Sequence, residues 1–295
     1  MMDLSSPGTV RAIREKYGLQ PSKSLGQNFI TDRNVLERIV EGAGISSEDM
    51  VIEIGPGIGV LTAALAEHAA FVTAVEIDGR LIPVLEETLA GCGNVRVLNA
   101  DILKTDIGQI INESRAEGLF AGKVHIVGNL PYYITTPIIM KLLEDQVPAD
   151  SITVMMQKEV ADRIRSAPGS RTYGAISVAV QYYCSVAKIT DVPKEAFVPR
   201  PKVESTVLRL EPLGEKQVAV RDEKMFLRCV KAGFAQRRKT LLNSLASAGG
   251  MDKETVRRTL ETAGIDPGRR AETLTVDEFG RIADGFTDEH NQRNS

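Results

Sequence analysis

The stretch Val51-Ile52-Glu53-Ile54-Gly55-Pro56-Gly57-Ile58-Gly59 carries the strongest fold signal in the sequence. A short apolar run, typical of a buried strand, leads into a glycine turn that opens a helical segment. Glycines let the backbone approach a ligand closely, as in dinucleotide folds. Here, however, the spacing is G-x-G-x-G, and Pro56 removes a backbone N–H that a pyrophosphate would use. The stretch predicts a site for a ligand without phosphates, and the alternative is a turn that only packs the helix against the strand.

On both sides of this stretch, apolar runs alternate with helical segments, which indicates an α/β protein with a parallel, doubly wound sheet. The expected strands cover residues 50–54, 71–75, 94–98, 123–127 and 151–156, and the expected helices lie near 59–68, 79–90, 105–114 and 136–145. A helix over 175–183 and an edge or antiparallel strand over 205–210 complete this part. Ligands of such sheets bind at the carboxyl ends of the strands.

The strand pattern stops around residues 211–214, and only helical segments follow, over 222–235, 240–248, 253–263 and 276–283. We therefore expect a first domain over 1–213, including an N-terminal arm, and a small all-helical domain over 214–295. Residues 206–295 hold sixteen Lys and Arg against fourteen Asp and Glu, while residues 1–205 hold twenty against twenty-five. The chain has a net charge of −3, so a surface for nucleic acid must be local.

The composition also bounds the class of protein. The three cysteines, Cys92, Cys184 and Cys229, form no metal motif and no disulfide framework, and they fit a reducing compartment. No signal peptide and no membrane span are expected, because no apolar stretch is long enough. The pattern predicts a cytoplasmic protein without a bound metal.

The sequence Val124-His125-Ile126-Val127-Gly128-Asn129-Leu130-Pro131-Tyr132-Tyr133 is a second buried strand, which Gly128 is expected to end. The Asn129 amide and a proline-fixed carbonyl offer two hydrogen-bond acceptors, and Tyr132 offers a flat face. This combination suits a flat, amine-bearing group such as a nucleobase. The alternative is a strand end that turns through Pro131 and buries both tyrosines. Thr135 or Thr136 is the expected cap of the next helix.

Two acidic residues follow other expected strands. Glu76 ends the run 71–75, where a carboxylate can accept both hydroxyls of a ribose. Asp101 lies just past the third strand, where it can accept the exocyclic amine of an adenine while Ile102 contacts the ring. The alternatives are a surface acid for Glu76 and a helix cap for Asp101.

Three further segments carry candidate binding residues. In Ser24–Ile30 the amides of Gln27 and Asn28 could close over a ligand, although an ordinary loop is the simpler interpretation. In residues 197–203, Phe197 could provide a second stacking face while Arg200 and Lys202 meet phosphates. The alternative is a rigid loop with a buried phenylalanine and a solvated basic edge. In residues 231–239, Arg237, Arg238 and Lys239 lie at the end of an expected helix, where cations also suit the helix dipole.

Together these motifs resemble the ribosomal RNA adenine dimethyltransferase family, with the closest match to its bacterial small-subunit branch. The resemblance extends from Ser24-Leu25-Gly26-Gln27-Asn28-Phe29 through the glycine turn, Glu76 and Asn129-Leu130-Pro131-Tyr132 to the segment 197–203. It implies a Rossmann-like class I methyltransferase domain followed by the small helical domain. It also implies S-adenosylmethionine as the co-substrate.

The resemblance further implies the target and the roles of residues. The target would be two adjacent adenosines in the terminal hairpin loop near the 3′ end of small-subunit (16S) ribosomal RNA, each dimethylated at N6. Asn129 and Leu130 would hold the amine, beside Pro131, while Tyr132 and Phe197 would stack on the base. The donor-binding residues implied are Asn28, Ile30, Gly55, Gly57, Glu76, Ile77, Asp101, Ile102 and Asn129.

Three other functions are compatible with parts of the pattern. Erythromycin-resistance methyltransferases share the catalytic motif but act on large-subunit RNA. A nicotinamide dehydrogenase has a similar sheet, although the G-x-G-x-G spacing and the Asn-Leu-Pro-Tyr motif disfavour it. A ribosome-assembly factor would use the basic tail domain. We expect the protein to act as a monomer on the small ribosomal subunit.

Overall fold

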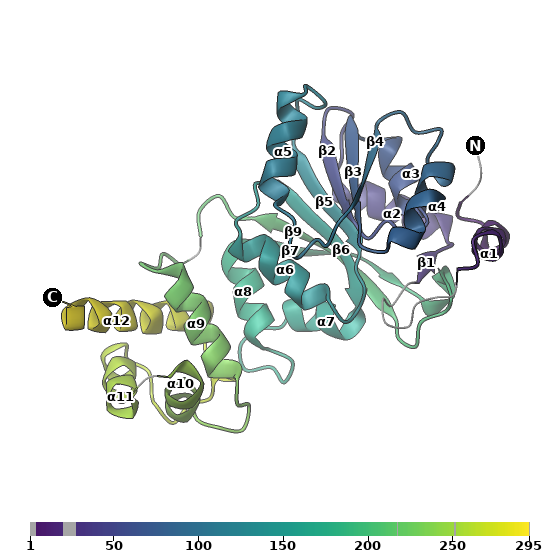
Figure 1. Ribbon diagram of the computed structural model, residues 1–295. Coiled ribbons are helices and arrows are strands. Elements are labelled where there is room, and N and C mark those ends of the chain that lie inside the picture. The colour runs from purple at the N-terminus through teal and green to yellow at the C-terminus, as the bar shows by residue number, and fades with distance from the viewer. Residues whose placement is uncertain (1–3, 20–27, 217, 251, 295) are drawn as a thin grey trace. The chain divides into compact units, whose positions relative to one another are not determined.

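The apolar runs of the chain form a seven-stranded sheet with the strand order β4-β3-β2-β5-β6-β9-β7 (Figure 1). The computed structural model describes residues 4–19, 28–216, 218–250 and 252–294. Strands β2 to β6 are parallel, and β9 runs antiparallel to β6. The strands are β2 (Met50–Ile54), β3 (Phe71–Glu76), β4 (Val95–Asn99), β5 (Val124–Asn129), β6 (Ser151–Gln157), β7 (Cys184–Val192) and β9 (Ser205–Pro212).

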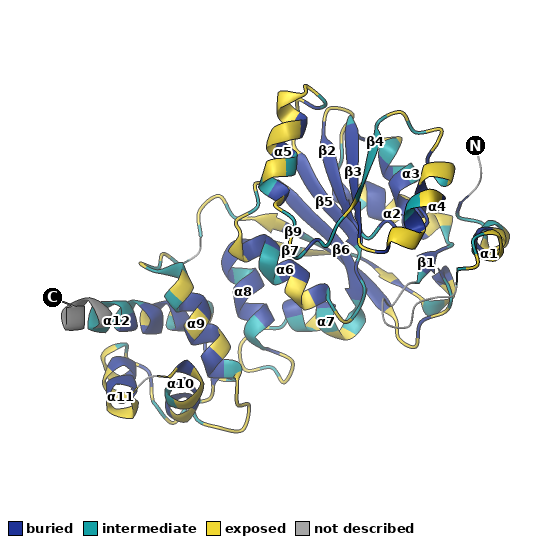
Figure 2. Ribbon diagram, viewed as in Figure 1, coloured by how far each residue is buried: buried dark blue, intermediate teal, exposed yellow. Residues whose placement is uncertain are grey.

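The strand order reverses between β2 and β5. From β2 the chain steps to β3 and β4 on one side, and then crosses back to β5 and β6 on the other. Right-handed crossovers in opposite directions place helices on both faces of a sheet, and helices flank both faces here (Figure 1). Strands β2, β3 and β5 are buried along nearly their whole length (Figure 2). The predicted doubly wound α/β fold is confirmed.

The helices of this part begin at local signals in the sequence. Asp32 caps the start of α2 by accepting hydrogen bonds from the backbone N–H groups of Asn34 and Val35, and Gly44 ends the helix with a left-handed φ of 64°. Asp106 caps α5 in the same way through the N–H of Gln109. The helices are α1 (Pro7–Lys16), α2 (Arg33–Ala43), α3 (Val60–Ala66), α4 (Ile82–Thr88), α5 (Ile107–Ala116), α6 (Thr135–Glu144) and α7 (Lys158–Ile164), and η1 (Gly79–Leu81) is a single 3₁₀ turn before α4.

Two details around the Asn-Leu-Pro-Tyr segment were predicted wrongly. Gly128 does not end β5, because the strand continues through Asn129; a Cβ at Gly128 would lie 2.9 Å from the carbonyl oxygen of Ile54. Neither threonine caps α6. Ile134 occupies the cap position without a side-chain hydrogen bond, and the buried Thr135 hydroxyl instead donates to the carbonyl of Pro131 at 3.1 Å.

Some elements had no clear signal in the sequence. Strand β7 alternates only weakly, and α7 follows β6 without a loop. A two-stranded antiparallel sheet joins β1 (Phe29–Ile30) to β8 (Phe197–Val198), which follows a 3₁₀ turn, η2 (Lys194–Ala196). Its partners are about 170 residues apart in the chain, as in the pairing of Phe29 with Val198, so local patterns cannot reveal it. The predicted antiparallel strand over 205–210 is confirmed as β9.

The chain divides into two compact units, residues 1–161 with 186–212, and residues 162–185 with 213–295. The sheet and the two-stranded β1–β8 pair belong to the first unit. The segment 162–185, which the sequence placed with the first domain, groups with the helical part, because α8 packs on α9. The second unit also contains α8 (Ala175–Tyr183), α9 (Glu223–Phe234), α10 (Leu241–Gly249), α11 (Lys253–Thr262), η3 (Ala271–Thr273) and α12 (Val276–Asn294).

Aromatic side chains fill the core of the second unit. Phe226 on α9 is fully buried and lies 4.3 Å, between ring centroids, from Tyr182 on α8. Phe279 on α12 is also fully buried and stacks on Phe234 at 5.7 Å. Burying rings of this size contributes much of the stability of a small helical unit.

Candidate active site

A cavity of about 970 Å³, including its open mouth, lies at the carboxyl ends of β2, β3 and β5. The cavity lies where the strand order reverses, the place where open α/β sheets bind ligands. Its walls come from residues far apart in the sequence: Asn28–Ile30, Glu53–Gly57, Val60, Leu61, Val75–Ile77, Ala100–Ile102, Asn129–Ile134 and Ile138.

The glycine turn after β2 forms one wall. Gly55, Gly57 and Gly59 have left-handed φ values of 72°, 62° and 89°. A Cβ at Gly57 would also lie 3.0 Å from the ring of Phe29. Side chains at these positions would therefore strain the backbone. Pro56 has no N–H, so the turn has one backbone donor fewer for a phosphate. A ligand can instead pack closely against the backbone of the glycines.

Glu76, at the end of β3, is held rigidly in the cavity wall. One carboxylate oxygen accepts a hydrogen bond from the N–H of Gly57 at 3.2 Å, and the other accepts from the N–H of Asp78 at 2.8 Å. The side chain is almost entirely buried, and this burial raises its pKa although the two N–H donors lower it. A carboxylate has about four acceptor sites on its two oxygens, so it can accept further hydrogen bonds beside those from backbone N–H groups.

Asp101 and two isoleucines form the next part of the wall. One oxygen of Asp101 accepts a hydrogen bond from the N–H of Leu103 at 3.0 Å, and the other lies 3.7 Å from the Lys104 ammonium. Asp101 stabilises a local turn, while the cap of the next helix is Asp106. Ile102 is buried and Ile77 is half exposed, and both line the cavity. The three residues combine an acceptor with two apolar surfaces.

Asn129, at the end of β5, is oriented by a contact across the cavity wall. Its amide nitrogen donates a hydrogen bond to the backbone carbonyl of Asn28 at 2.9 Å. Since the nitrogen is used in this contact, the amide oxygen is the group left to accept a hydrogen bond from a ligand. Asn28 and Ile30 line the same cavity as Asn129, whereas Gln27 lies outside the described residues.

The residues after Asn129 form a turn that leads into α6. The carbonyl of Pro131 accepts hydrogen bonds from the N–H of Ile134 and the hydroxyl of Thr135, both at 3.1 Å. Tyr132 is half buried, and its hydroxyl lies 2.8 Å from that of Ser205 on β9. Burial raises the pKa of this phenol. The ring is thus fixed at both ends, by the turn and by the hydroxyl contact.

Phe197 does not line the cavity in this structure. It lies in β8, opposite Ile30 of β1, and only 3% of its surface is exposed. Its ring belongs to the hydrophobic core of the first unit. The sequence contains the aromatic residue but gives no information on its pairing partner.

Glu53 is a cavity residue that the sequence reasoning missed. It lies in the middle of β2, lines the cavity and is 1% exposed. One of its carboxylate oxygens has no hydrogen-bond partner among the described residues. Burial and the nearby Glu76 raise its pKa to about 8, so the carboxyl is largely protonated at neutral pH. The signal was present, because Glu53 interrupts an otherwise apolar strand.

The predicted RNA-binding cations differ in their surroundings. Arg200 forms an ion pair with Glu195, while Lys202 is exposed. Arg237 donates a hydrogen bond to the backbone carbonyl of Arg171 at 2.6 Å, and no carboxylate neutralises it within the described chain. Arg238 and Lys239 beside it are exposed. The 237–239 cluster is therefore more available to phosphates than Arg200.

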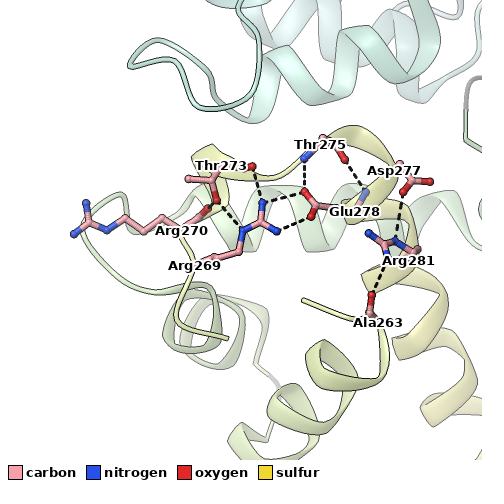
Figure 3. Close-up of polar contacts among 8 residues, drawn as sticks. All are labelled: Ala263, Arg269, Arg270, Thr273, Thr275, Asp277, Glu278 and Arg281. Carbon is pink, nitrogen blue, oxygen red and sulfur yellow. Dashed lines mark hydrogen bonds and ion pairs between the residues drawn. The ribbon is translucent and has the colours of Figure 1, made fainter. Parts of the chain in front are cut away.

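Other arginines of the second unit are engaged in its structure. Arg269 donates to both carboxylate oxygens of Glu278, at 2.5 and 3.1 Å, and to the carbonyl of Thr273 (Figure 3). The Arg270 side chain points away from this network in the same view. Arg258 similarly pairs with Glu289. Adjacent basic residues in the sequence therefore have different roles, and charge runs overstate the basic surface.

Within the described part of the chain, no group of three or more His, Cys, Asp or Glu side chains is arranged to hold a metal ion. None of the helices in the described residues is both long and apolar enough to cross a bilayer.

Comparisons with known proteins agree with this arrangement. A sequence profile described as "Ribosomal RNA adenine dimethylase" matches residues 18–288. A protein of Bacillus cereus strain B4264 named "Ribosomal RNA small subunit methyltransferase A" is 50% identical over 289 residues, covering 97% of this chain and 98% of the relative. A protein of the same name from Alkaliphilus oremlandii is 50% identical over 285 residues, covering 96% of this chain and 98% of the relative.

Two solved structures resemble the chain. A dimethyladenosine transferase from Plasmodium falciparum has a TM-score of 0.71 at 24% identity, covering 90% of this chain and 98% of its own, and it supports the fold alone. The 23S rRNA methyltransferase ErmE has a TM-score of 0.62 at 27% identity, covering 88% of this chain and all of its own. With the profile match and the 50% identical relatives, these likenesses establish that the chain belongs to the ribosomal RNA adenine dimethylase family.

Proposed function

We propose that this protein transfers methyl groups from S-adenosylmethionine to N6 of two adjacent adenosines in the terminal hairpin loop of small-subunit (16S) ribosomal RNA. The observation that carries the proposal is Asn129, held by the Asn28 carbonyl at 2.9 Å, in a cavity that also contains Glu76 and Asp101. A donor site and an acceptor for an amine thus share one cavity. The name of the 50% identical relatives supports the small subunit as the target.

The cavity fits S-adenosylmethionine, which supplies a methyl group activated by a sulfonium. Glu76 would accept the two ribose hydroxyls, and Asp101 would accept the adenine amine. Ile77 and Ile102 would contact the adenine ring. Gly55 and Gly57 allow the backbone to approach the ligand, and Asn28 and Ile30 close the opposite wall.

The Asn-Leu-Pro-Tyr segment would hold the target base. The N6 lone pair of adenine is delocalised into its ring, which makes the amine a poor nucleophile. The amide oxygen of Asn129 and the carbonyl of Leu130 would accept its two hydrogens and fix the direction of the lone pair. Tyr132, whose hydroxyl is fixed by Ser205, would stack on the ring.

The rate enhancement would come mainly from positioning. The adenosine must leave the stack of its loop to enter the cavity, which costs little in a hairpin loop. No general base is required, because the methylated ammonium is acidic enough to lose its proton to water. In the second transfer only one amine hydrogen needs an acceptor, so the pocket must accommodate the first methyl group.

Arg237, Arg238 and Lys239 are proposed to contact ribosomal RNA, and Lys202 and Arg200 to contribute near the catalytic unit. Phosphate contacts from Lys and Arg provide affinity and orientation rather than sequence recognition. Because one copy of the chain contains every proposed residue, we propose that it acts as a monomer, in the cytoplasm where its ribosomal substrate is found. A role in small-subunit assembly would use the same basic surface.

The decisive experiment is transfer of labelled methyl groups to small subunits that lack the modification, followed by nucleoside analysis. We expect N6,N6-dimethyladenosine with the wild-type protein and a loss of about 100-fold or more with Asn129→Ala, since an oriented acceptor is removed. Large subunits serve as the parallel substrate. Transfer only to large subunits would favour an activity like that of ErmE, to which the chain is 27% identical.

An assembly role is tested with the same variant. If the inactive Asn129→Ala protein still binds immature small subunits and corrects an assembly defect, binding has a role in assembly that does not require methyl transfer. Failure of the variant to bind would restrict the protein to its enzymatic role.

A further inference from the structure

Tyr133 has the largest exposed fraction, 57%, among the large apolar side chains that stand out as exposed in the described chain. It lines the cavity directly beside Tyr132. No hydrogen bond, ion pair or ring contact joins its side chain to another described residue. Tyr17 differs, since it is partly buried against the core and its hydroxyl donates a hydrogen bond to the Glu87 carboxylate. An open aromatic face without a partner, at the mouth of a cavity, is available to a ligand.

The two consecutive tyrosines are not equivalent. Tyr132 is half buried, and its hydroxyl is held by Ser205 at 2.8 Å, so its ring is fixed in the wall. Burial raises the pKa of Tyr132, whereas Tyr133 is open to solvent. A base that enters the cavity would therefore meet Tyr132. The ring of Tyr133 remains for a nucleotide that stays outside.

We propose that Tyr133 stacks on the nucleotide next to the target adenosine, an inference that rests on the proposed function. When one base leaves its stack, the base beside it loses a stacking partner. An aromatic side chain can replace that partner without regard to base identity, because every base has a flat face. Since the proposed target is a pair of adjacent adenosines, Tyr133 would hold one adenosine while the other is methylated.

Tyr133 is thus a positioning residue for the RNA, not a catalytic residue. Stacking on the flanking nucleotide stabilises the bound RNA both before and during methyl transfer, so its loss should affect KM more than kcat. The position of the second adenosine would also become less defined. Loss of the ring should therefore increase the fraction of RNA in which only one of the two adenosines is dimethylated.

The test compares Tyr133→Phe, Tyr133→Leu and Tyr133→Ala in methyl transfer to unmodified small subunits. Phenylalanine keeps the aromatic face, leucine keeps apolar bulk, and alanine keeps neither. We expect the Phe variant to retain the wild-type KM, and the Leu and Ala variants to raise KM about tenfold with little change in kcat. Nucleoside mapping should show more half-modified RNA for Leu and Ala.

Two controls separate stacking from other effects. The melting temperature and the affinity for S-adenosylmethionine by calorimetry should be the same in all variants, because the ring is exposed and unpartnered. An unchanged KM for Tyr133→Ala would overturn the proposal. A wild-type KM for Tyr133→Leu would also overturn it, because it would mean that apolar bulk, rather than an aromatic face, makes the contact. Absence of methyl transfer by the wild-type protein would be seen first, and it would overturn the proposed function itself.

Discussion

Glu76 is the residue on which donor binding should depend most. Its two carboxylate oxygens are oriented by the N–H groups of Gly57 and Asp78, and the residue lines the cavity. Replacing it with alanine would remove both proposed acceptors for the ribose. Because hydrogen bonds to a charged group contribute about 1.5–3 kcal/mol, we expect Glu76→Ala to weaken donor binding by about 100-fold in calorimetry.

The control is Glu67→Ala, which removes an exposed acid at the end of α3 outside the cavity lining. It should leave donor affinity unchanged. A Glu76→Ala protein that is folded, by its melting temperature, and still binds the donor normally would exclude Glu76 from the site.

Individual residues also show which parts of the cavity could be predicted from the sequence. Glu76 and Asn129 each end a strand, and that local context is readable from a pattern of apolar residues. Glu53 lies inside a strand, and its side-chain direction depends on which face of β2 meets the cavity. Phe197 is buried by a strand partner in β1, a contact that no local pattern contains.

Among the elements, three strands are joined at their amino ends by a buried polar cluster. His125 in β5 lies with its Nδ1 2.8 Å from the Ser151 hydroxyl of β6, and its Nε2 lies 3.2 Å from the Asp49 carboxylate just before β2. Asp49 also accepts hydrogen bonds from the N–H groups of Ser46 and Lys123. The cluster therefore links β2, β5 and β6 opposite the cavity end of the sheet.

This cluster predicts a dependence of stability on pH. Burial lowers the pKa of His125 below 6.5, and the charge of Arg209 lowers it further. The nearby carboxylates of Asp49 and Asp150 raise it, but by less. The unfolded chain then binds a proton more readily than the folded protein, so stability is lost as the pH falls below about 6.5. Burial alone would raise the pKa of Asp49, but hydrogen bonds from Ser46 and Lys123 outweigh it and lower the pKa below 3.8. The stability that Asp49 contributes is therefore lost only at a lower pH than that of His125.

Urea unfolding at pH 7.5 and pH 5.5 measures this effect. We expect the free energy of unfolding of the wild-type protein to fall by up to about 1.4 kcal/mol per pH unit below 6.5 through His125. A His125→Asn variant should be less stable at pH 7.5 but should lose less stability on acidification. His68→Asn, at an exposed histidine, should leave the profile unchanged. Identical pH profiles for wild type and His125→Asn would contradict the prediction.

The elements also show how far local signals extend. The parallel strands and most helices were predicted because apolar periodicity acts within a few neighbouring residues. The start of α6 was predicted wrongly, since the Thr135 hydroxyl bonds to the Pro131 carbonyl in a turn that only the folded cavity wall defines. Strand β7 was missed because its alternation is weak.

For the molecule as a whole, RNA binding should depend on local rather than net charge. Replacing Arg237, Arg238 and Lys239 with alanine should weaken binding to small-subunit RNA and reduce the slope of log K against log salt by about two to three units, since released counterions follow phosphate contacts. The measurement is a titration at several salt concentrations. A matched triple variant, Arg11, Arg33 and Lys123 to alanine, removes the same charge from exposed sites of the first unit.

The control should change the salt slope little. Equal slopes for the wild type and the 237–239 variant would mean that this cluster is only a solvated face. Retained methyl transfer at low salt by the 237–239 variant would agree with a role in RNA binding, since the catalytic unit is left intact.

The doubly wound sheet, the glycine turn and the Asn-Leu-Pro-Tyr segment could be predicted from local sequence, because apolar periodicity, glycine backbone freedom and proline geometry act over a few neighbouring residues. The tertiary structure alone decided that β2 lies beside β5, that Asn129 is held by the Asn28 carbonyl and that Phe197 is buried. Each of these depends on the pairing and register of segments about 70 to 170 residues apart, for which no local pattern carries information.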